Sequence, residues 1–248
     1  MIKKHDLFNS PDNQNQKIWR YLDFTKLVDL LYSSSLYFTR ADLFNDIFEG
    51  SITKTTSELR AKRLNDLIKM GQSRYVGKSD WWSKENQNAR KEIAINCWHM
   101  NDHESAAMWK LYLKSNEGIA IQSTYERLIR SLDETKIAIL VGAVKYIDYD
   151  KDMIDSNKFS AFLHKRKSFE HEKELRCIIW KSGFNNSTKI NLDNGGVKVE
   201  VNLMKLIENV YVSPDSPTWF TELVKEVSEE FEVNVPVINS RINDTPIY

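Results

Sequence analysis

The sequence has little of what several common protein classes require. Its 248 residues include two cysteines, Cys97 and Cys177, too few for a disulfide scaffold and typical of a reducing compartment. Eight glycines are few for this length, and neither a Gly-x-Gly-x-x-Gly dinucleotide motif nor a phosphate-loop Gly-Lys-Ser/Thr occurs. No window approaches about eighteen uninterrupted apolar residues, so we expect a cytoplasmic protein without a membrane segment.

An excess of charge of either sign is also missing. Lys and Arg together number 35, as do Asp and Glu, so the formal net charge at pH 7 is zero. Proteins that bind nucleic acid through their overall charge carry an excess of basic residues. The composition therefore predicts no global nucleic-acid-binding charge. Aromatic residues, in contrast, make up 11% of the chain, and some are candidates to line a ligand pocket.

The order of apolar patterns predicts an α+β fold, with a mixed, mainly antiparallel β-sheet, flanking helices and a helical insert. Residues 1–16 are polar and aperiodic, so we expect a flexible N-terminal arm before a single domain at residues 17–248. Two polar helices are predicted at about residues 54–92, as an insert or lid. Residues 137–146 are expected to form one strand, and residues 155–169 a helix.

A charged run passes directly into an apolar one at residues 165–180. From Glu172 onward, alternation predicts a strand with one apolar face and one face carrying Glu172, Glu174 and Arg176. Two carboxylates about 7 Å apart on such a face could act on one ligand and shift each other's ionisation. The alternative is a solvated strand face in which Glu174 pairs with Arg176.

A second candidate residue lies on the first predicted strand, residues 18–22. Trp19 and Tyr21 fall on one face of this strand, whereas Arg20 falls among apolar residues on the other. A guanidinium group in such surroundings requires an anionic partner. The partner is either a protein carboxylate or a phosphate group of a ligand.

Residues 40–50 are rich in turn formers and place Asp46 and Glu49 beside two phenylalanines. Loops of this kind often carry functional side chains. The alternative interpretation is an Asx turn and a helix cap held by the aromatic rings.

A helix predicted at residues 104–112 places Ser105, Trp109 and Tyr112 on one face. An aromatic stripe at this spacing is typical of a core-facing helix. Because Ser105 is polar, the edge of a wet pocket is the competing interpretation.

Metal-dependent chemistry has two candidate residue sets. Zinc would need Cys97, His99 and His103, with His164, His171 or Cys177 as the fourth ligand. That spacing matches no standard zinc pattern, so we predict no metal site from it. A nuclease would instead bind Mg²⁺ through Asp46, Glu49, Glu172 and Glu174, with Lys165 nearby.

Taken together, these motifs resemble a bacterial family known as domain of unknown function 2971. The resemblance extends from residue 17 to about residue 240. It rests on Ile18-Trp-Arg-Tyr, Phe44-Asn-Asp-Ile-Phe-Glu49, Cys97-Trp-His, Met108-Trp-Lys-Leu-Tyr112, and Lys165 followed by Glu172, Glu174 and Arg176. Ile47 and Phe169 stand where this family commonly has Pro and Trp. The resemblance implies almost nothing about activity, and a role as a toxin or in phage defence is an expectation from the type of family.

The order of the motifs is also similar to ADP-ribosyltransferases of the arginine, serine, glutamate type. In that family the arginine clamps a phosphate of NAD and the last glutamate binds the nicotinamide ribose hydroxyl. The resemblance thus implies Arg20 as the clamp and Glu174 as the catalytic acid, with Glu172 beside it. The central strand departs from that family, because it reads Asn96-Cys-Trp-His and lacks the Ser-Thr-Ser pattern.

The leading hypothesis is therefore a nucleotide-pocket enzyme that resembles an NAD-dependent ADP-ribosyltransferase or NAD glycohydrolase. Its predicted catalytic residues are Glu174 and Glu172. Its predicted cofactor-binding residues are Arg20, Tyr21, Asp46, Glu49, Trp98, His99, Ser105, Trp109, Tyr112, Lys165 and Arg176. The alternatives are a Mg²⁺-dependent nuclease and a non-catalytic sensing or interaction module.

Overall fold

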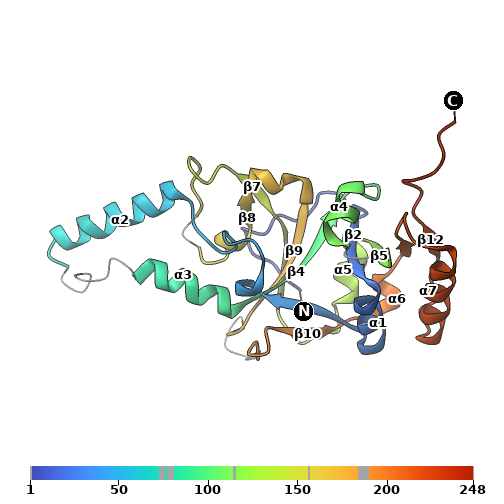
Figure 1. Cartoon of the computed structure of the whole chain (residues 1–248). Coiled ribbons are helices and arrows are strands. Elements are labelled where there is room, and N and C mark those ends of the chain that lie inside the picture. The colour runs from blue at the N-terminus through green and yellow to red at the C-terminus, as the bar shows by residue number, and fades with distance from the viewer. Residues whose placement is uncertain are drawn as a thin grey trace.

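The computed structural model describes residues 2–72, 76, 81–113, 116–155, 157–183 and 190–247. Within these residues, ten strands form one mixed, mainly antiparallel sheet, with helices on both sides (Figure 1). This architecture confirms the predicted α+β class. None of the helices in the described ranges is both long and apolar enough to cross a membrane.

The main path through the sheet runs from its N-terminal edge strand to its C-terminal one. Its order is β1 (Ile2–Lys3), β6 (Ile139–Ala143), β9 (Glu174–Trp180), β4 (Ile93–Met100), β2 (Lys17–Asp23), β5 (Gly118–Thr124), β11 (Asn209–Val212) and β12 (Val237–Asn239). A branch leaves β4 through β3 (Ser35–Arg40), which pairs with β10 (Gly196–Glu200). β7 (Lys145–Ile147) and β8 (His164–Arg166) form a separate parallel ladder.

One face of the sheet carries a single continuous apolar core. The helices that cover it are α1 (Phe24–Ser33), α5 (Tyr125–Ser131), α6 (Leu203–Leu206) and α7 (Thr218–Glu230). Their buried side chains pack on alternate residues of the strands, such as Leu175 and Cys177 of β9. We call this side the apolar face.

The opposite face carries two smaller apolar clusters. One gathers around Ile95, Ile178 and the short 3₁₀ helix η3 (Ser160–Phe162). The other gathers Trp19 and Tyr21 of β2 beneath α4 (Ala106–Tyr112). Charged side chains from β8 and β9 lie on this side as well, and we call it the charged face.

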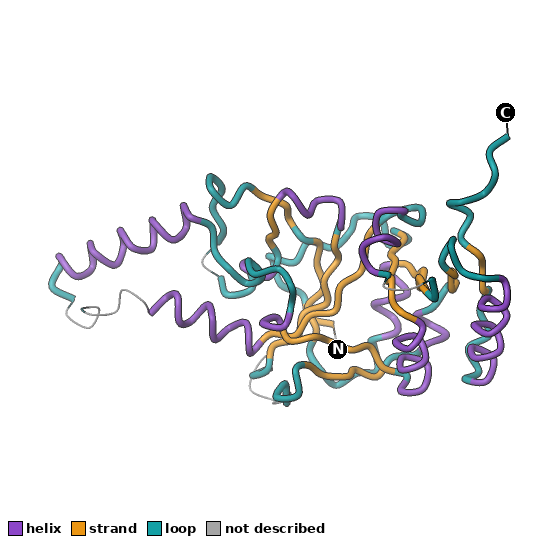
Figure 2. Tube along the Cα trace, viewed as in Figure 1, coloured by secondary structure: helices purple, strands orange, loops and turns teal. Residues whose placement is uncertain are grey.

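Two helices project from the sheet as a pair (Figure 2). α2 (Lys54–Lys69) leads away from the core and α3 (Trp81–Glu92) returns to it, over the range in which sequence patterns predict two polar helices. Thr53 begins α2 as its N-cap, because its hydroxyl oxygen accepts a hydrogen bond from the Thr56 amide. Whether this pair acts as a lid stays a prediction.

Three expectations need correction. The arm predicted at residues 1–16 is packed on the domain, because β1 pairs in parallel with β6 and Phe8 is buried. The single strand predicted at 137–146 is divided into β6 and β7, since Val144 bonds to the Glu174 carbonyl and the chain then changes partner. The helix predicted at 155–169 is instead η3, β8 and the start of the 3₁₀ helix η4 (Lys167–Glu172).

Candidate functional site at a fork in the sheet

The sheet forks beside β4. β2 pairs with β5 along its whole length, but with β4 only at Ile18–Met100 and Trp19–His99. Further along β4, β3 becomes the partner at Ile95. Residues 96–98 therefore have no strand partner on this side in the described structure, and side chains fill the gap.

Arg20 occupies this fork. Its Nη1 donates a hydrogen bond to the Cys97 carbonyl at 3.3 Å, and its guanidinium carbon lies 5.9 Å from the centre of the Trp98 ring. Burial lowers the pKa of Arg20 from its ordinary value. Among the described residues Arg20 makes no ion pair, so the protein carboxylate that was one expected partner is not found. Arg20 is partly buried, and a carbonyl dipole and an aromatic ring compensate a cation in such surroundings only in part.

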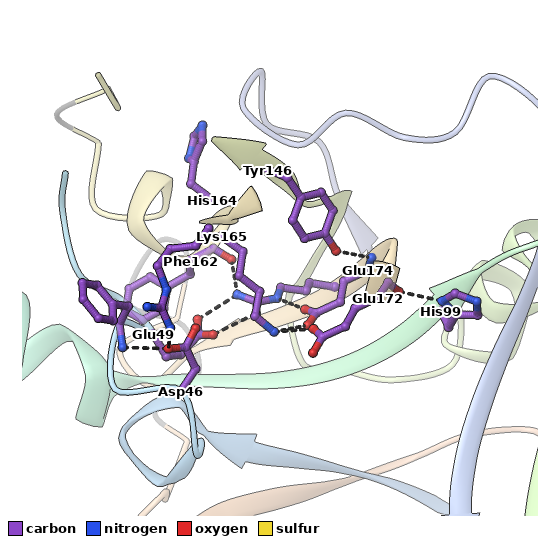
Figure 3. Close-up of polar contacts among 12 residues, drawn as sticks. Asp46, Glu49, His99, Tyr146, Phe162, His164, Lys165, Glu172 and Glu174 are labelled. Carbon is purple, nitrogen blue, oxygen red and sulfur yellow. Dashed lines mark hydrogen bonds and ion pairs between the residues drawn. The ribbon is translucent and has the colours of Figure 1, made fainter. Parts of the chain in front are cut away.

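Next to the fork, five charged side chains of the charged face form one network (Figure 3). Arg176 is its centre: two guanidinium nitrogens donate to the two carboxylate oxygens of Glu49 at 2.7 and 2.8 Å, and Nε donates to Glu174 at 2.5 Å. Lys165 Nζ donates to Glu174 at 2.8 Å and also to Glu172. All five side chains are buried, and we call them the ion network.

The backbone at Lys173 decides where Glu172 lies. Sequence alternation places Glu172 on the strand, but Lys173 has a left-handed conformation with φ +38°, so η4 ends at Glu172 and β9 begins at Glu174. Glu172 thus approaches Lys165 from the end of a 3₁₀ helix. Its carbonyl accepts a hydrogen bond of 2.7 Å from Nδ1 of His99. The two carboxylates therefore do not share a strand face, but both are bound by Lys165.

The two adjacent glutamates ionise differently. Burial opposes the charge of Glu174, but Arg176 and Lys165 outweigh it and hold the pKa of Glu174 below its usual range. Burial, followed by the hydrogen bond and negative charge of Glu174, raises the pKa of Glu172 to about 7. Near neutral pH, Glu174 is therefore ionised while Glu172 exchanges a proton. Enzymes separate general acids or bases from stabilising carboxylates in this way.

Tyr112 connects the fork to the ion network. Burial, followed by the charge of Glu172, raises the pKa of Tyr112, and the same ring lies close enough to Arg20 to influence its pKa. Tyr112 is nonetheless 44% exposed, so its ring offers an accessible aromatic surface beside both groups. Burial also raises the pKa of the Cys97 thiol, which keeps it protonated and unsuited to act as a nucleophile.

His99 is held in one tautomer. Because Nδ1 bonds to the Glu172 carbonyl, Nδ1 carries the proton and Nε2 is an acceptor. Nε2 is buried and has no hydrogen-bond partner in the described part of the chain, and burial lowers the pKa of the ring, so His99 is neutral. The ring also contacts Tyr21 edge-on, at a centroid distance of 6.3 Å. His99 therefore positions Glu172 through its backbone.

Other predicted site residues have structural partners. Trp98 is buried in the core of the apolar face and donates to the Asn96 side chain, so it does not join the ion network. Ser105 is the N-cap of α4, and its hydroxyl accepts from the Met108 amide. Trp109 packs edge-on against Tyr21 at 5.0 Å and donates to Glu104.

Asp46 lies at the margin of the ion network. Its Oδ1 accepts from the Phe48 amide, which is the Asx turn named as the alternative, and it pairs with Arg166 at 3.1 Å. Tyr146 was not predicted: its hydroxyl accepts a hydrogen bond of 2.8 Å from the Glu174 amide and so fixes the start of β9. No local sequence signal identifies Tyr146, because β7 and β9 are distant in the chain.

The metal-ligand sets are not assembled in the described part of the chain, which contains no group of three or more His, Cys, Asp or Glu side chains suited to a metal ion. The donor set of the ion network explains this on the charged face. The oxygens of Glu49 and Glu174 are already bound by Arg176, and Lys165 lies between Glu172 and Glu174. The position that a divalent cation would need is thus taken by protein cations.

Comparison with known proteins adds a distant likeness. No protein-family model matches the chain, so the resemblance to domain of unknown function 2971 gains no support there, and no curated protein matches it. Three solved structures of DarT from Thermus sp. 2.9 are similar to it. The complex with carba-NAD⁺ has a TM-score of 0.41 and 8% sequence identity, and the match covers 94% of this chain and 97% of that chain. The complex with NAD⁺ has a TM-score of 0.42 and 8% identity, with 92% of this chain and 97% of that chain covered. The complex with ADP-ribosylated ssDNA has a TM-score of 0.43 and 7% identity, with 94% of this chain and 97% of that chain covered. At these TM-scores we carry no residue role over from DarT.

Proposed function

We propose that the fork and the ion network form the active site of an enzyme that cleaves the nicotinamide–ribose bond of NAD and transfers ADP-ribose to an acceptor. The observation that carries this proposal is the pair of adjacent buried carboxylates: Lys165 binds both, whereas Arg176 binds Glu174 alone of the two, at 2.5 Å. This arrangement lowers the pKa of Glu174, while burial raises the pKa of Glu172 to about 7. A glycosidic bond breaks through an oxocarbenium-like transition state, which a fixed carboxylate stabilises.

In this mechanism the bond between ribose C1′ and the nicotinamide nitrogen breaks, and its electron pair leaves with neutral nicotinamide. The ionised Glu174 stabilises the positive charge that develops on the ribose. An acceptor hydroxyl, or water in simple hydrolysis, then attacks C1′ and loses its proton to ionised Glu172. Because Glu172 must be ionised to accept this proton, turnover is expected to rise as the pH increases through about 7.

The remaining residues take binding roles in the proposal. Arg20, which lacks an ion-pair partner among the described residues, would exchange its bond to the Cys97 carbonyl for a phosphate of NAD. The exposed ring of Tyr112 would stack on nicotinamide beside Glu172. Lys165 and Arg176 position the two glutamates. A role as a toxin or in phage defence stays a prediction.

One observation favours a second candidate, a non-catalytic interaction module. The side chains of Arg176 and Glu49 are 0% and 2% exposed, and they form a bidentate pair, as in a structural ion network. A Mg²⁺-dependent nuclease gains no such support, because protein cations already bind the carboxylates.

The test is release of nicotinamide from NAD by the purified protein, with Glu174→Gln as the variant. Glu170→Gln is the matched control, because Glu170 is exposed in the same 3₁₀ helix that carries Glu172 and lies outside the ion network. We expect Glu174→Gln to lower turnover at least about 100-fold, and Glu170→Gln to leave it unchanged. Thermal melting verifies that both variants fold. Wild-type turnover in a folded Glu174→Gln protein would sink the proposal, and an inactive wild type that does not bind NAD would favour the module.

A further inference from the structure

A cavity of about 540 Å³ lies outside the proposed active site, between α2 and α3. One wall consists of Ser57, Arg60, Leu64 and Asn65, on one face of α2, and the other of Asn86, Gln87 and Arg90 on α3. Residues 49–52 close its inner end. Its volume falls in the range of small-molecule sites, about 300–1,000 Å³. The spacing of these residues on each helix, at three, four and seven positions, turns both polar faces towards one another.

The lining of this cavity is basic. It includes the guanidinium groups of Arg60 and Arg90, whereas Glu49, the acid among the described lining residues, is already neutralised by two hydrogen bonds from Arg176. Arg60 also borders a neighbouring cavity of about 250 Å³ that contains acidic residues, so Arg90 is the more specific anchor for an anion. Arginine binds phosphate through paired, planar donors.

Arg90 is held in position by a tight contact. A Cβ atom at Gly50 would lie 2.9 Å from Cγ of Arg90 and 2.6 Å from Cε1 of Phe162, so only glycine allows this approach, and its φ of +71° also favours glycine. Nε of Arg90 is buried and has no hydrogen-bond partner among the residues that the structure describes. Buried donors are normally satisfied, so this N–H is available to a polar group in the cavity.

From these observations we infer that the cavity between α2 and α3 binds a phosphate-bearing small molecule of about mononucleotide size. Arg90 contacts the phosphate. The amide side chains of Asn65, Asn86 and Gln87 bind the remaining polar groups, and Leu64 packs against an apolar part. Inorganic phosphate alone would leave most of this volume and the amide groups unused, so a nucleoside monophosphate fits the lining better.

The cavity also reaches the ion network. Glu49 lines the cavity and binds Arg176, which in turn binds Glu174. A ligand in the cavity thus lies two side chains from the ionised glutamate. Binding there is independent of whether the proposed NAD chemistry takes place.

The experiment is isothermal titration of the purified protein with AMP, GMP, CMP and UMP, with adenosine and inorganic phosphate as separate arms. The variant is Arg90→Gln, and its matched control is Arg63→Gln, which removes the same charge from the exposed side of α2. Asn65→Leu, at an exposed position in the lining, provides a second test if Arg90→Gln folds poorly. Arg20→Gln distinguishes this cavity from the fork.

At least one mononucleotide is expected to bind, and Arg90→Gln or Asn65→Leu should lower the affinity for that mononucleotide at least tenfold. Arg63→Gln should bind mononucleotide like the wild type, and Arg20→Gln should retain the binding that Arg90→Gln weakens. Adenosine and inorganic phosphate should bind at least tenfold more weakly than the best mononucleotide. The inference fails if no mononucleotide binds, if adenosine or inorganic phosphate binds as tightly, or if Arg90→Gln and Asn65→Leu leave affinity unchanged. It also fails if Arg20→Gln abolishes binding, because the ligand would then occupy the fork.

Discussion

The two faces of the sheet are built from the same strands but stabilised in different ways. On the apolar face, four helices bury one continuous set of aliphatic and aromatic side chains. On the charged face, the apolar packing is divided into two clusters, and an ion network with three carboxylates and two cations lies on the same side. Apolar burial is non-directional and tolerant of exchange. Buried charges lose their hydration and are stable only in one complementary arrangement.

This difference explains why the candidate site lies where it does. β9 contributes Leu175 and Cys177 to the apolar face and Glu174 and Arg176 to the charged face, because successive side chains alternate. A sequence could fill the second face with aliphatic residues at equal or better stability. Retention of five buried charges beside a fork therefore favours a chemical role for the charged face.

The largest effect is expected from Arg176→Met, which leaves Glu49 buried without a counter-ion. We expect a loss of about 3–5 kcal/mol in the free energy of unfolding, measured by urea denaturation at pH 7. Adding Glu49→Leu should recover part of this loss, because it removes the unpaired charge. If Arg176→Met alone were as stable as the wild type, the ion network would not be a constraint on the fold.

On the apolar face, Leu128→Ala removes a fully buried side chain of α5. This change is expected to lower the free energy of unfolding by about 2–5 kcal/mol, because apolar burial is lost and a cavity remains. Unlike changes in the ion network, this loss should be the same at pH 5 and pH 8, since no charge is involved. A strong pH dependence of the Leu128→Ala effect would show that the two faces are not energetically separate.

Replacing Glu172 by Gln is expected to have an intermediate, pH-dependent effect on the free energy of unfolding. The folded-state pKa of Glu172, about 7, lies above its ordinary value of 4.5, so the folded protein holds this proton more tightly than the unfolded chain. The stabilisation is present below pH 4.5 and is lost as the pH rises to about 7. Compared with Glu172→Gln, the wild type should therefore lose about 1–3 kcal/mol of its free energy of unfolding as the pH rises across this interval.

Urea denaturation of both proteins between pH 4 and pH 8 measures this difference. The depressed pKa of Glu174 acts at lower pH, where stability is lost on acidification, so the two effects occupy separate intervals. Parallel stability curves for wild type and Glu172→Gln would contradict the elevated pKa.

The smallest effect is expected from Lys198→Ala. Lys198 pairs with Asp29 at 2.5 Å, but the two side chains are 43% and 52% exposed. Exposed ion pairs contribute about 0–1 kcal/mol because water and salt screen them. Denaturation in low and high salt should place this variant within about 0.5 kcal/mol of the wild type. A loss as large as that of Arg176→Met would mean that burial does not distinguish the two pairs.

Alternation along single strands was sufficient to predict the faces of β2 and most of β9. It placed Trp19 and Tyr21 together and Glu174 with Arg176, and both groupings are found. It failed for Glu172, because the left-handed residue Lys173 separates Glu172 from the strand, so β9 begins at Glu174, two residues later than polarity indicates.

The position of Trp98 could not be predicted from its strand. β4 is buried on both faces, so its apolar residues show no alternation that would indicate the side to which Trp98 belongs. The contact of Glu172 with His99 and that of Glu49 with Arg176 join elements far apart in the chain. The cavity beside Arg90 was missed for another reason: on isolated helices, facing polar sides look like sides exposed to solvent.

The most direct test of the central claim is a ¹³C NMR titration of the glutamate side-chain carboxyl groups, with Glu172→Gln and Glu174→Gln spectra used for assignment. We expect Glu172 to titrate near pH 7, and Glu174 to stay ionised to a pH below the ordinary glutamate range. If both carboxyls titrated together near their ordinary value of 4.5, they would not be separated into an ionised group and a proton-exchanging group. The proposed chemistry of the charged face would then have no basis.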